Sequence, residues 1–177
     1  MKWYLTSSVF FCLCFVASLT CNKPSGANEK TMLAVVLNSD REDYSLSNDI
    51  HLDVRVVNSS EESLTIYGRL LWGYAGGLTL HVTADSDKEI APKVLDDDLV
   101  IPSTLVDRNS FVVLAPNHYL GTTRIERLTD LVEKPGTYFI RVEYRSPVPL
   151  KFGQGPKFWS FEKPPISSQT IEVHITQ

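Results

Sequence analysis

Apolar and polar residues alternate with a period of two along several short segments of this chain of 177 residues. The clearest examples are residues 50–57, 78–83, 138–144 and 171–176. Further β-rich runs cover residues 31–38, 64–66 and 111–114. A strand that lies between a core and solvent shows this period, because successive side chains point to opposite faces of the sheet. Only residues 126–132 suggest a helical turn, so the pattern predicts an all-β fold.

The segment Pro135-Gly136-Thr137-Tyr138 opens the clearest of these strands. In immunoglobulin-like sandwiches, a tyrosine near the start of strand F bonds through its hydroxyl to backbone upstream, a feature called the tyrosine corner. Tyr138 fits this role, with Leu131 placed to pack beneath it; the alternative is an ordinary buried tyrosine. We therefore predict an antiparallel immunoglobulin-like β-sandwich of seven to eight strands.

A longer pattern surrounds this corner. It runs from Leu131 through Pro135-Gly136-x-Tyr138-x-Ile140-x-Val142-x-Tyr144, then Trp159-Ser160, then Ser168 and the terminal strand. It resembles exported bacterial immunoglobulin-like domains over about the C-terminal third of the chain. The resemblance implies the fold and carries no catalytic residues. Antibody-type domains match poorly, because the paired cysteines of strands B and F are missing.

The N-terminus reads as an export signal. Residues 1–20 carry one charge, Lys2, ahead of an apolar run and small residues, and residues 22–30 are polar. The order predicts a signal peptide at 1–20, a flexible tether at 21–30 and the β-sandwich domain at 31–177. The segment Ser18-Leu19-Thr20-Cys21 resembles a bacterial lipobox, although Leu19 is one place too close to the cysteine and Thr20 is larger than usual. Lipidation of Cys21 is one interpretation; a conventional cut after Ala17 or Ser18 is the other.

The cysteine count favours lipidation. Cys12 and Cys14 lie within the signal, so Cys21 is the single cysteine of the mature chain and has no internal disulfide partner. We expect a bacterial cell-envelope lipoprotein that is bound to the membrane through this anchor. The alternative is a soluble secreted or periplasmic protein.

Charge and motifs limit the chemistry. The net charge is −4, and no Lys/Arg run stands out, which argues against nucleic acid and against a basic membrane footprint. The histidines (His51, His81, His118 and His174) lack ligand spacing, and the run 96–98 is read as a solvated acidic loop. No catalytic motif occurs, so we predict no enzyme, no cofactor and no metal site.

A long connection, residues 146–168, is the candidate binding loop. Its aromatic residues, with two from another connection, are Phe152, Phe158, Trp159, Phe161, Trp72 and Tyr74. Ordered loops of this length are uncommon unless they are functional or packed by their own side chains. Exposed rings could bind a sugar or a protein partner. The alternative is that Trp159 and its neighbours cap the open end of the core.

These features predict a non-enzymatic binding or accessory structural role, with an envelope protein or glycan as partner. Two alternatives stay open. One is a peptidase inhibitor on an immunoglobulin-like scaffold, similar to chagasin-type inhibitors, whose Asn-Pro-Thr-Thr-Gly loop is missing from this sequence. The other is a carbohydrate-binding module that uses the aromatic loop.

Overall fold

The computed structural model describes residues 32–73, 76–84, 89–90 and 108–177. The strands are β1 (Leu33–Ser39), β2 (Asp43–Ser45), β3 (Asp49–Asn58), β4 (Leu64–Tyr67), β5 (Leu71–Trp72), β6 (Gly77–Ala84), β7 (Glu89–Ile90), β8 (Phe111–Leu114), β9 (Tyr119–Arg127), β10 (Gly136–Tyr144), β11 (Ile166–Ser167) and β12 (Ile171–Thr176). The described residues also contain the α-helical turn α1 (Leu128–Leu131) and the 3₁₀ turns η2 (Arg108–Ser110) and η3 (Leu150–Phe152). The prediction of an all-β fold is confirmed.

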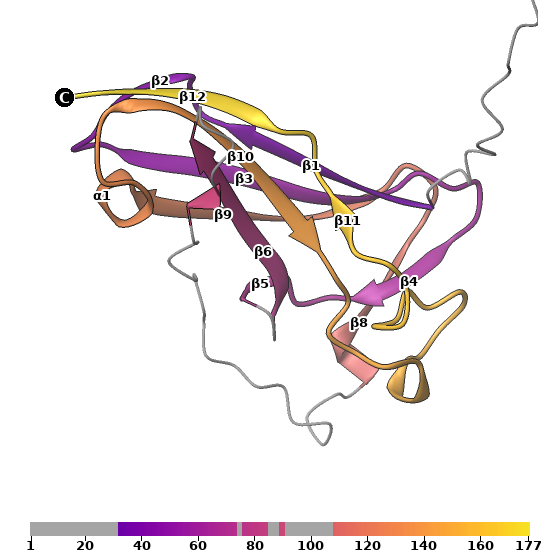
Figure 1. Cartoon of the computed structure of the whole chain (residues 1–177). Helices are drawn as coiled ribbons and strands as arrows, with labels where there is room; N and C mark the ends of the chain where they lie inside the picture. Colours follow the sequence, from indigo (N-terminus) through magenta and orange to yellow (C-terminus); the bar gives the residue numbers. More distant parts are fainter. Residues whose placement is uncertain (1–31, 74–75, 85–88, 91–107) are drawn as a thin grey trace, which may run out of the picture.

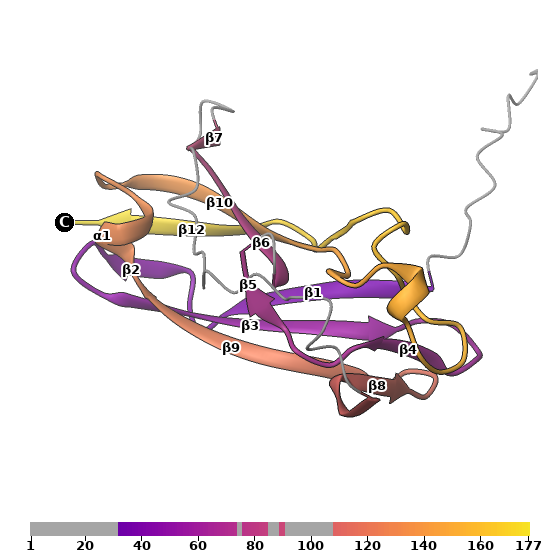
Figure 2. The same ribbon diagram turned by 90° about the horizontal axis from the view of Figure 1, so that it is seen from below.

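Two sheets face each other (Figures 1 and 2). One has the strand order β1-β3-β9, and the other has the order β2-β12-β10-β6-β5, with β11 and β7 at its margins. The N-terminal strand is split between them: β1 pairs antiparallel with β3, and β2 pairs parallel with β12. This is an immunoglobulin-like arrangement, in which β6, β10 and β12 correspond to strands C, F and G. A separate two-stranded antiparallel sheet of β4 and β8 extends one end of the sandwich.

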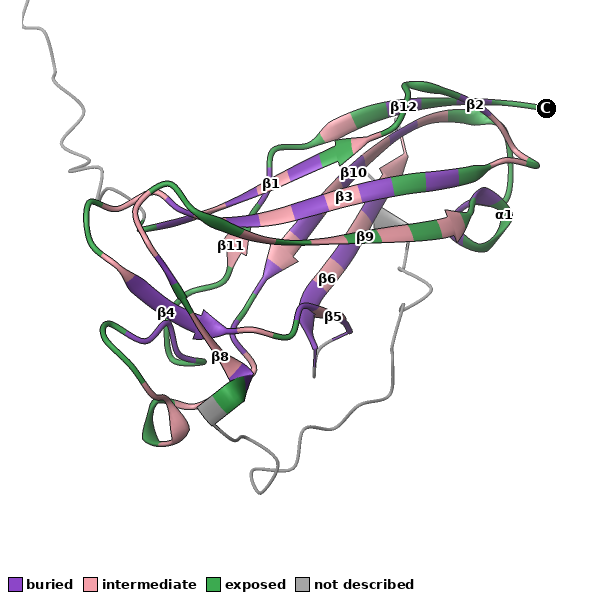
Figure 3. Cartoon of the chain, turned by 180° about the vertical axis from the view of Figure 1, so that it is seen from behind, coloured by how far each residue is buried: buried purple, intermediate pink, exposed green. Residues whose placement is uncertain are grey.

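The core lies between the two sheets, and the predicted alternation creates it (Figure 3). On β3 the side chains of Ile50, Leu52, Val54 and Val56 are fully buried. The facing strands β10, β6 and β12 bury their apolar positions against them in one hydrophobic cluster. Burial of each such side chain contributes about 1.5–3 kcal/mol. The period of two therefore fixes which face of each strand points inward.

The sequence did not predict β9. This strand has nine residues, as many as β10, and among the described strands only β3 is longer. Its register with β3 places Leu120, Thr122, Arg124 and Glu126 on the inner face. Arg124 forms an ion pair with Glu126, and its guanidinium lies 5.7 Å from the centre of the Trp72 ring. Because this inner face is polar, residues 119–127 show no alternation of apolar and polar side chains, and the sequence pattern did not indicate a strand there.

Tyr138 has the geometry of a tyrosine corner. The residue is buried, and its hydroxyl donates a 2.7 Å hydrogen bond to the carbonyl of Lys134, four residues upstream. Leu131 ends the helical turn α1 just before this corner and is buried in the same core. Burial, helped by the charge of Glu133, raises the pKa of Tyr138, so the hydroxyl stays protonated and continues to donate.

Asn58 links β3 to the two-stranded β4–β8 sheet. Its side chain is fully buried, and its amide nitrogen donates to the carbonyls of Glu62 and Leu114. Its amide oxygen accepts from the backbone N–H and the hydroxyl of Ser60. The turn after β3 is thus organised by one buried amide whose oxygen and nitrogen both have partners.

Several predicted features lie outside the described residues. These are the signal and the tether with Cys21, the candidate residue Tyr74 and the acidic run at 96–98.

Candidate functional site

The connection after β10 is fastened to β4, and we call residues 145–165 the end loop. The backbone N–H and the hydroxyl of Thr65 both donate to the carbonyl of Pro156, at 3.1 and 2.8 Å. The N–H of Trp159 donates to the carbonyl of Thr65 at 2.8 Å. These bonds pair the loop with β4 in the way that a neighbouring strand would pair with it. They give this long connection a defined position.

The end loop also has a small core of its own. Phe158 packs edge-on against Phe111 of β8, with 5.3 Å between ring centres, and Phe111 packs in the same way against Tyr67. A Cβ atom at Gly153 would lie 1.9 Å from the Phe158 ring, so only glycine admits this contact. Gly155 has a φ of +91° and lies against Thr65, which also requires glycine. The loop is therefore packed by its own side chains.

A cavity of about 530 Å³ opens beside this core. Its lining residues are Met32, Leu64, Leu150, Gly153, Gly155, Lys157, Phe158, Trp159 and Lys163. The apolar part comes from segments far apart in the sequence, since Met32 precedes β1 and Leu150 begins η3. The volume lies in the range of small-molecule sites, and the combination of apolar floor and two ammonium groups suits an amphipathic or anionic partner.

Three cations lie over aromatic rings on the end loop. The distances to the ring centres are 4.1 Å for Arg145 over Phe161, 4.7 Å for Lys151 over Phe152 and 5.9 Å for Lys163 over Trp159. Such pairs are worth about 0.5–1 kcal/mol at exposed sites. They hold positive charge next to apolar surface.

Glu162 supports the start of η3. Its carboxylate accepts from the backbone N–H of Leu150 at 3.0 Å. A hydrogen bond from Ser160, followed by backbone hydrogen bonds that include the one from Leu150, lowers the pKa of this carboxyl. Leu150 is consequently presented on an ordered turn.

The candidate aromatic residues divide into two groups. Phe158, Trp159 and Trp72 are buried, whereas Phe152 is half-buried and Phe161 is 43% exposed. Phe158 and Trp159 line the cavity, and Trp72 instead lies in β5 beside Arg124. The buried rings cannot form a stacking platform for a ligand.

Sequence reasoning missed the exposed part of the site. Leu150 is 61% exposed, and the three lysines of the loop were not singled out. An isolated leucine between prolines and lysines is a weak signal. The spacing of the basic residues was a better signal, because positions 145, 151, 157 and 163 are all basic and lie six residues apart.

The Trp159 indole has an unusual environment. Its Nε1 is buried and meets no hydrogen-bond acceptor among the described residues. Lys163 covers one face of the ring. A buried donor without an acceptor lowers the folding stability by about 1–3 kcal/mol. A wholly apolar side chain at position 159 would not have this cost.

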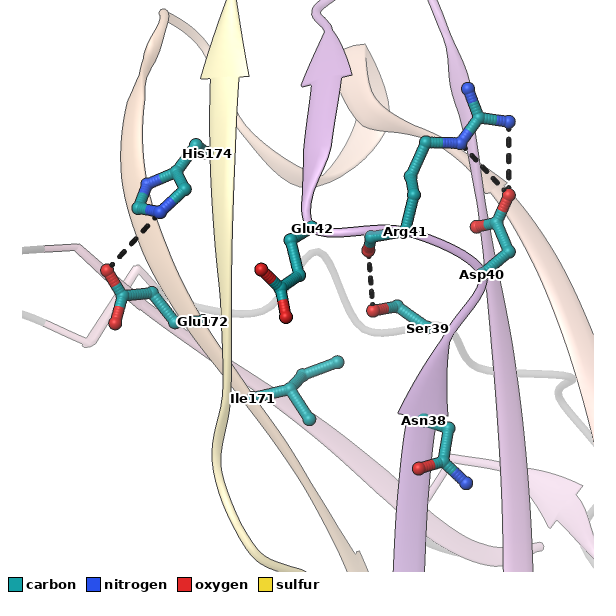
Figure 4. A pocket seen from close by; sticks show the side chains of 8 residues that line it. All are labelled: Asn38, Ser39, Asp40, Arg41, Glu42, Ile171, Glu172 and His174. Carbon is teal, nitrogen blue, oxygen red and sulfur yellow. Dashed lines mark hydrogen bonds and ion pairs between the residues drawn. The ribbon is translucent and has the colours of Figure 1, made fainter.

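A second pocket, of about 550 Å³, lies where the chain crosses from β1 to β2 beside β12 (Figure 4). Polar and charged side chains dominate its lining, which includes Asp40, Arg41, Glu42, Glu172 and His174. The Ser39 hydroxyl donates to the carbonyl of Arg41, and His174 lies 3.6 Å from Glu172. Both contacts are visible in the figure.

Asp40 organises this crossing. Its carboxylate accepts from the hydroxyl of Tyr44 at 2.6 Å, from the backbone N–H of His51 and from Arg41. Burial acts to raise the pKa of Asp40, but these hydrogen bonds and the Arg41 charge outweigh it and lower the pKa from 3.8 to about 2. Burial and the same carboxylate raise the pKa of Tyr44 to about 12. The bonds hold the crossing segment against β3.

Asp40→Asn should remove a pH-dependent part of the stability. The folded carboxyl has a lower pKa than the unfolded one, so its contribution is present above about pH 4 and is lost as the pH falls toward about 2. The difference in unfolding free energy between wild type and Asp40→Asn, measured by urea denaturation, should therefore be larger near pH 5 than near pH 2. A difference that does not change with pH would contradict this role.

Metal sites and membrane-spanning helices are the remaining features to consider in the described part of the chain. Among the described residues, no three His, Cys, Asp or Glu side chains come together as a metal site. His51, His118 and His174 are exposed, and His81 is half-buried. Within that part of the chain, no helix has the length and apolar character that would let it cross a membrane.

Comparison with known proteins gives distant fold likenesses. No family model and no curated protein matches the sequence. Similar solved structures include a β-glucosidase from Erythrobacter marinus (TM-score 0.40, 10% identity, 81% of this chain and 15% of that one). A CARDB domain from Pyrococcus furiosus (0.38, 11%, 81% and 91%) and a β-glucosidase from Listeria innocua (0.38, 15%, 81% and 16%) are also similar. The chain thus spans less than a fifth of each glucosidase, and at these scores the likenesses assign no activity.

Proposed function

We propose that this protein is a lipid-anchored module of the bacterial cell envelope that acts by binding, and that the end loop is its binding surface. The anchor is Cys21 of the exported chain. The end loop and its cavity then present apolar side chains and lysines to an envelope partner. Catalysis has no part in this proposal.

One observation carries it: a long connection is built into a rigid surface at the end of the sandwich where β1 begins. Met32 lines the same cavity as Leu150 and Lys163. An element that served only to cap the core would have no need to hold Leu150 exposed on an ordered turn. Rigid presentation of an apolar anchor is what binding surfaces require, because it lowers the entropy lost on association.

The glycan and peptidase-inhibitor alternatives receive less support from this geometry. Sugar binding by stacking needs free aromatic faces, and Phe158, Trp159 and Trp72 are buried. Phe161 is the most exposed ring of the end loop, and the Arg145 guanidinium already covers one of its faces. The surface offers an aliphatic side chain and ammonium groups instead.

The proposal is tested by the accessibility of single thiols in isolated cell envelopes. Thioether formation blocks Cys21, so an introduced cysteine is the single reactive thiol. Leu150→Cys should react with a membrane-impermeant maleimide several-fold more slowly than Ile125→Cys, because a partner covers the end loop. Ile125 is the matched control: it is an aliphatic residue on β9 with 57% exposure, and it lies toward the α1 end.

Mass spectrometry of the same preparation tests the anchor. The mature chain should begin at Cys21 and carry the mass of a diacylglycerol. An unmodified chain that starts at Ser18 or Leu19 would overturn the anchor. Equal maleimide rates at positions 150 and 125 would overturn the binding surface.

A further inference from the structure

The end loop combines positive charge with exposed apolar side chains in a chain that is acidic overall. Residues 145–165 contain four basic residues and one acidic residue, Glu162, a net charge of +3 in a chain of −4. Lys157 forms an ion pair with Glu62, which leaves Arg145, Lys151 and Lys163 to set the local charge. The basic residues are six apart in the sequence, so they form no run of the kind that would have predicted a basic membrane footprint.

The exposed apolar side chains lie among these cations. Leu150 directly precedes Lys151, and Phe161 lies under Arg145 and two residues before Lys163. Met32 is also exposed and lines the cavity beside them. Lysine and aromatic side chains suit the interface between headgroups and acyl chains, because their apolar bodies and polar ends face different surroundings.

The attachment point lies at this same end. β1 begins beside the end loop, whereas α1 and the C-terminus lie at the opposite end (Figures 1 and 2). Cys21 and Met32 are eleven residues apart, so the segment between them spans at most about 40 Å whatever path it takes. β3, with its 10 residues, separates the two ends by a further distance of about 33 Å. A lipid on Cys21 would therefore attach the domain at the end that carries the end loop, and the α1 end is the one farther from the attachment point.

We propose that the partner of the end loop is the anionic phospholipid surface of the membrane that holds the anchor. Leu150 and Phe161 enter the boundary between headgroups and acyl chains, and Lys151 and Lys163 meet lipid phosphates. This inference rests on the proposed anchoring at Cys21. One lipid chain alone gives marginal attachment, and a second contact of apolar and basic residues makes it stable. Basic residues near an anionic surface strengthen the attachment further.

The test uses the lipidated protein in vesicles of phosphatidylethanolamine and phosphatidylglycerol, with no other protein present. A fluorophore that is sensitive to polarity is attached at Leu150→Cys or, as control, at Ile125→Cys. Label at position 150 should shift to shorter wavelength and be quenched several-fold more by lipids that carry a headgroup-level spin label than label at position 125. The double reversal Lys151→Glu/Lys163→Glu should reduce this excess quenching.

The outcomes separate the two proposals. If the protein does not float with the vesicles, the anchor has failed. If it floats and both labels are quenched equally, the anchor stands and contact of the end loop with the bilayer is overturned. Slow thiol reaction at position 150 in cell envelopes together with no excess quenching in pure vesicles would assign the loop to a protein or glycan partner, and would overturn the bilayer contact.

Discussion

Phe158→Ala is expected to lower the free energy of unfolding by about 3–5 kcal/mol, the usual cost of emptying a phenylalanine site in a core. The ring is 9% exposed, packs edge-on against Phe111 and lies directly on the backbone of Gly153. Its removal leaves a cavity that the bonds between Thr65 and Pro156 prevent from collapsing. Chemical denaturation of the purified protein measures the loss.

Phe161→Ala is the matched control, because it removes the same side chain from the same loop. With an exposed ring, it should change the free energy of unfolding by about 0.5 kcal/mol or slightly more, since a partly covered surface ring contributes little. The pair of variants separates the two interpretations of the aromatic loop. Similar losses for both would show that the loop is not divided into a buried and an exposed set.

Asn58→Ala is expected to cost about 2–4 kcal/mol, because each buried polar group that loses its partner costs about 1–3 kcal/mol. The substitution leaves the carbonyls of Glu62 and Leu114 without the amide that now binds them at 2.7 and 2.8 Å. Asn58→Asp keeps the shape but replaces the donor with an acceptor, so it should be at least as harmful near neutral pH. Urea denaturation followed by tryptophan fluorescence measures both.

Asn38→Ala provides the comparison for this site. Asn38 is exposed near the end of β1, and its loss should change stability by about 0.5 kcal/mol or less. Equal losses of unfolding free energy at positions 38 and 58 would contradict the role of Asn58 as the link between β3 and the two-stranded β4–β8 sheet.

Alternation predicted the strands whose inner faces are apolar. β3, β10 and β12 each carry a continuous apolar face, and their positions follow from the sequence within one or two residues. β9 was not predicted, because Thr122, Arg124 and Glu126 occupy its inner positions and interrupt the apolar alternation. These polar groups are held by an ion pair and by the Trp72 ring, which are tertiary contacts that no local pattern contains.

The end loop was predictable as an element but not in its detail. Its length, its prolines and its aromatic residues indicated a packed or functional connection. Phe158 and Phe161 are three positions apart in one irregular segment, and no period says which ring turns inward. The contact between Gly153 and Phe158 and the pairing with Thr65 decide this. The basic surface was missed because it arises from isolated residues that are spaced along the loop.

The split of the N-terminal strand has a mechanical consequence. Under the proposed anchoring at Cys21, tension would reach the described domain at Met32, next to β1, which pairs with β3 over seven residues from Leu33 to Ser39. The hydrogen bonds of an antiparallel pair lie across the strands, so this pull shears them together instead of opening them one by one. Behind β1, the parallel pairing of β2 with β12 ties the same segment to the opposite sheet. A pull along β1 would therefore load the β1–β3 pairs together and, through β2, the opposite sheet.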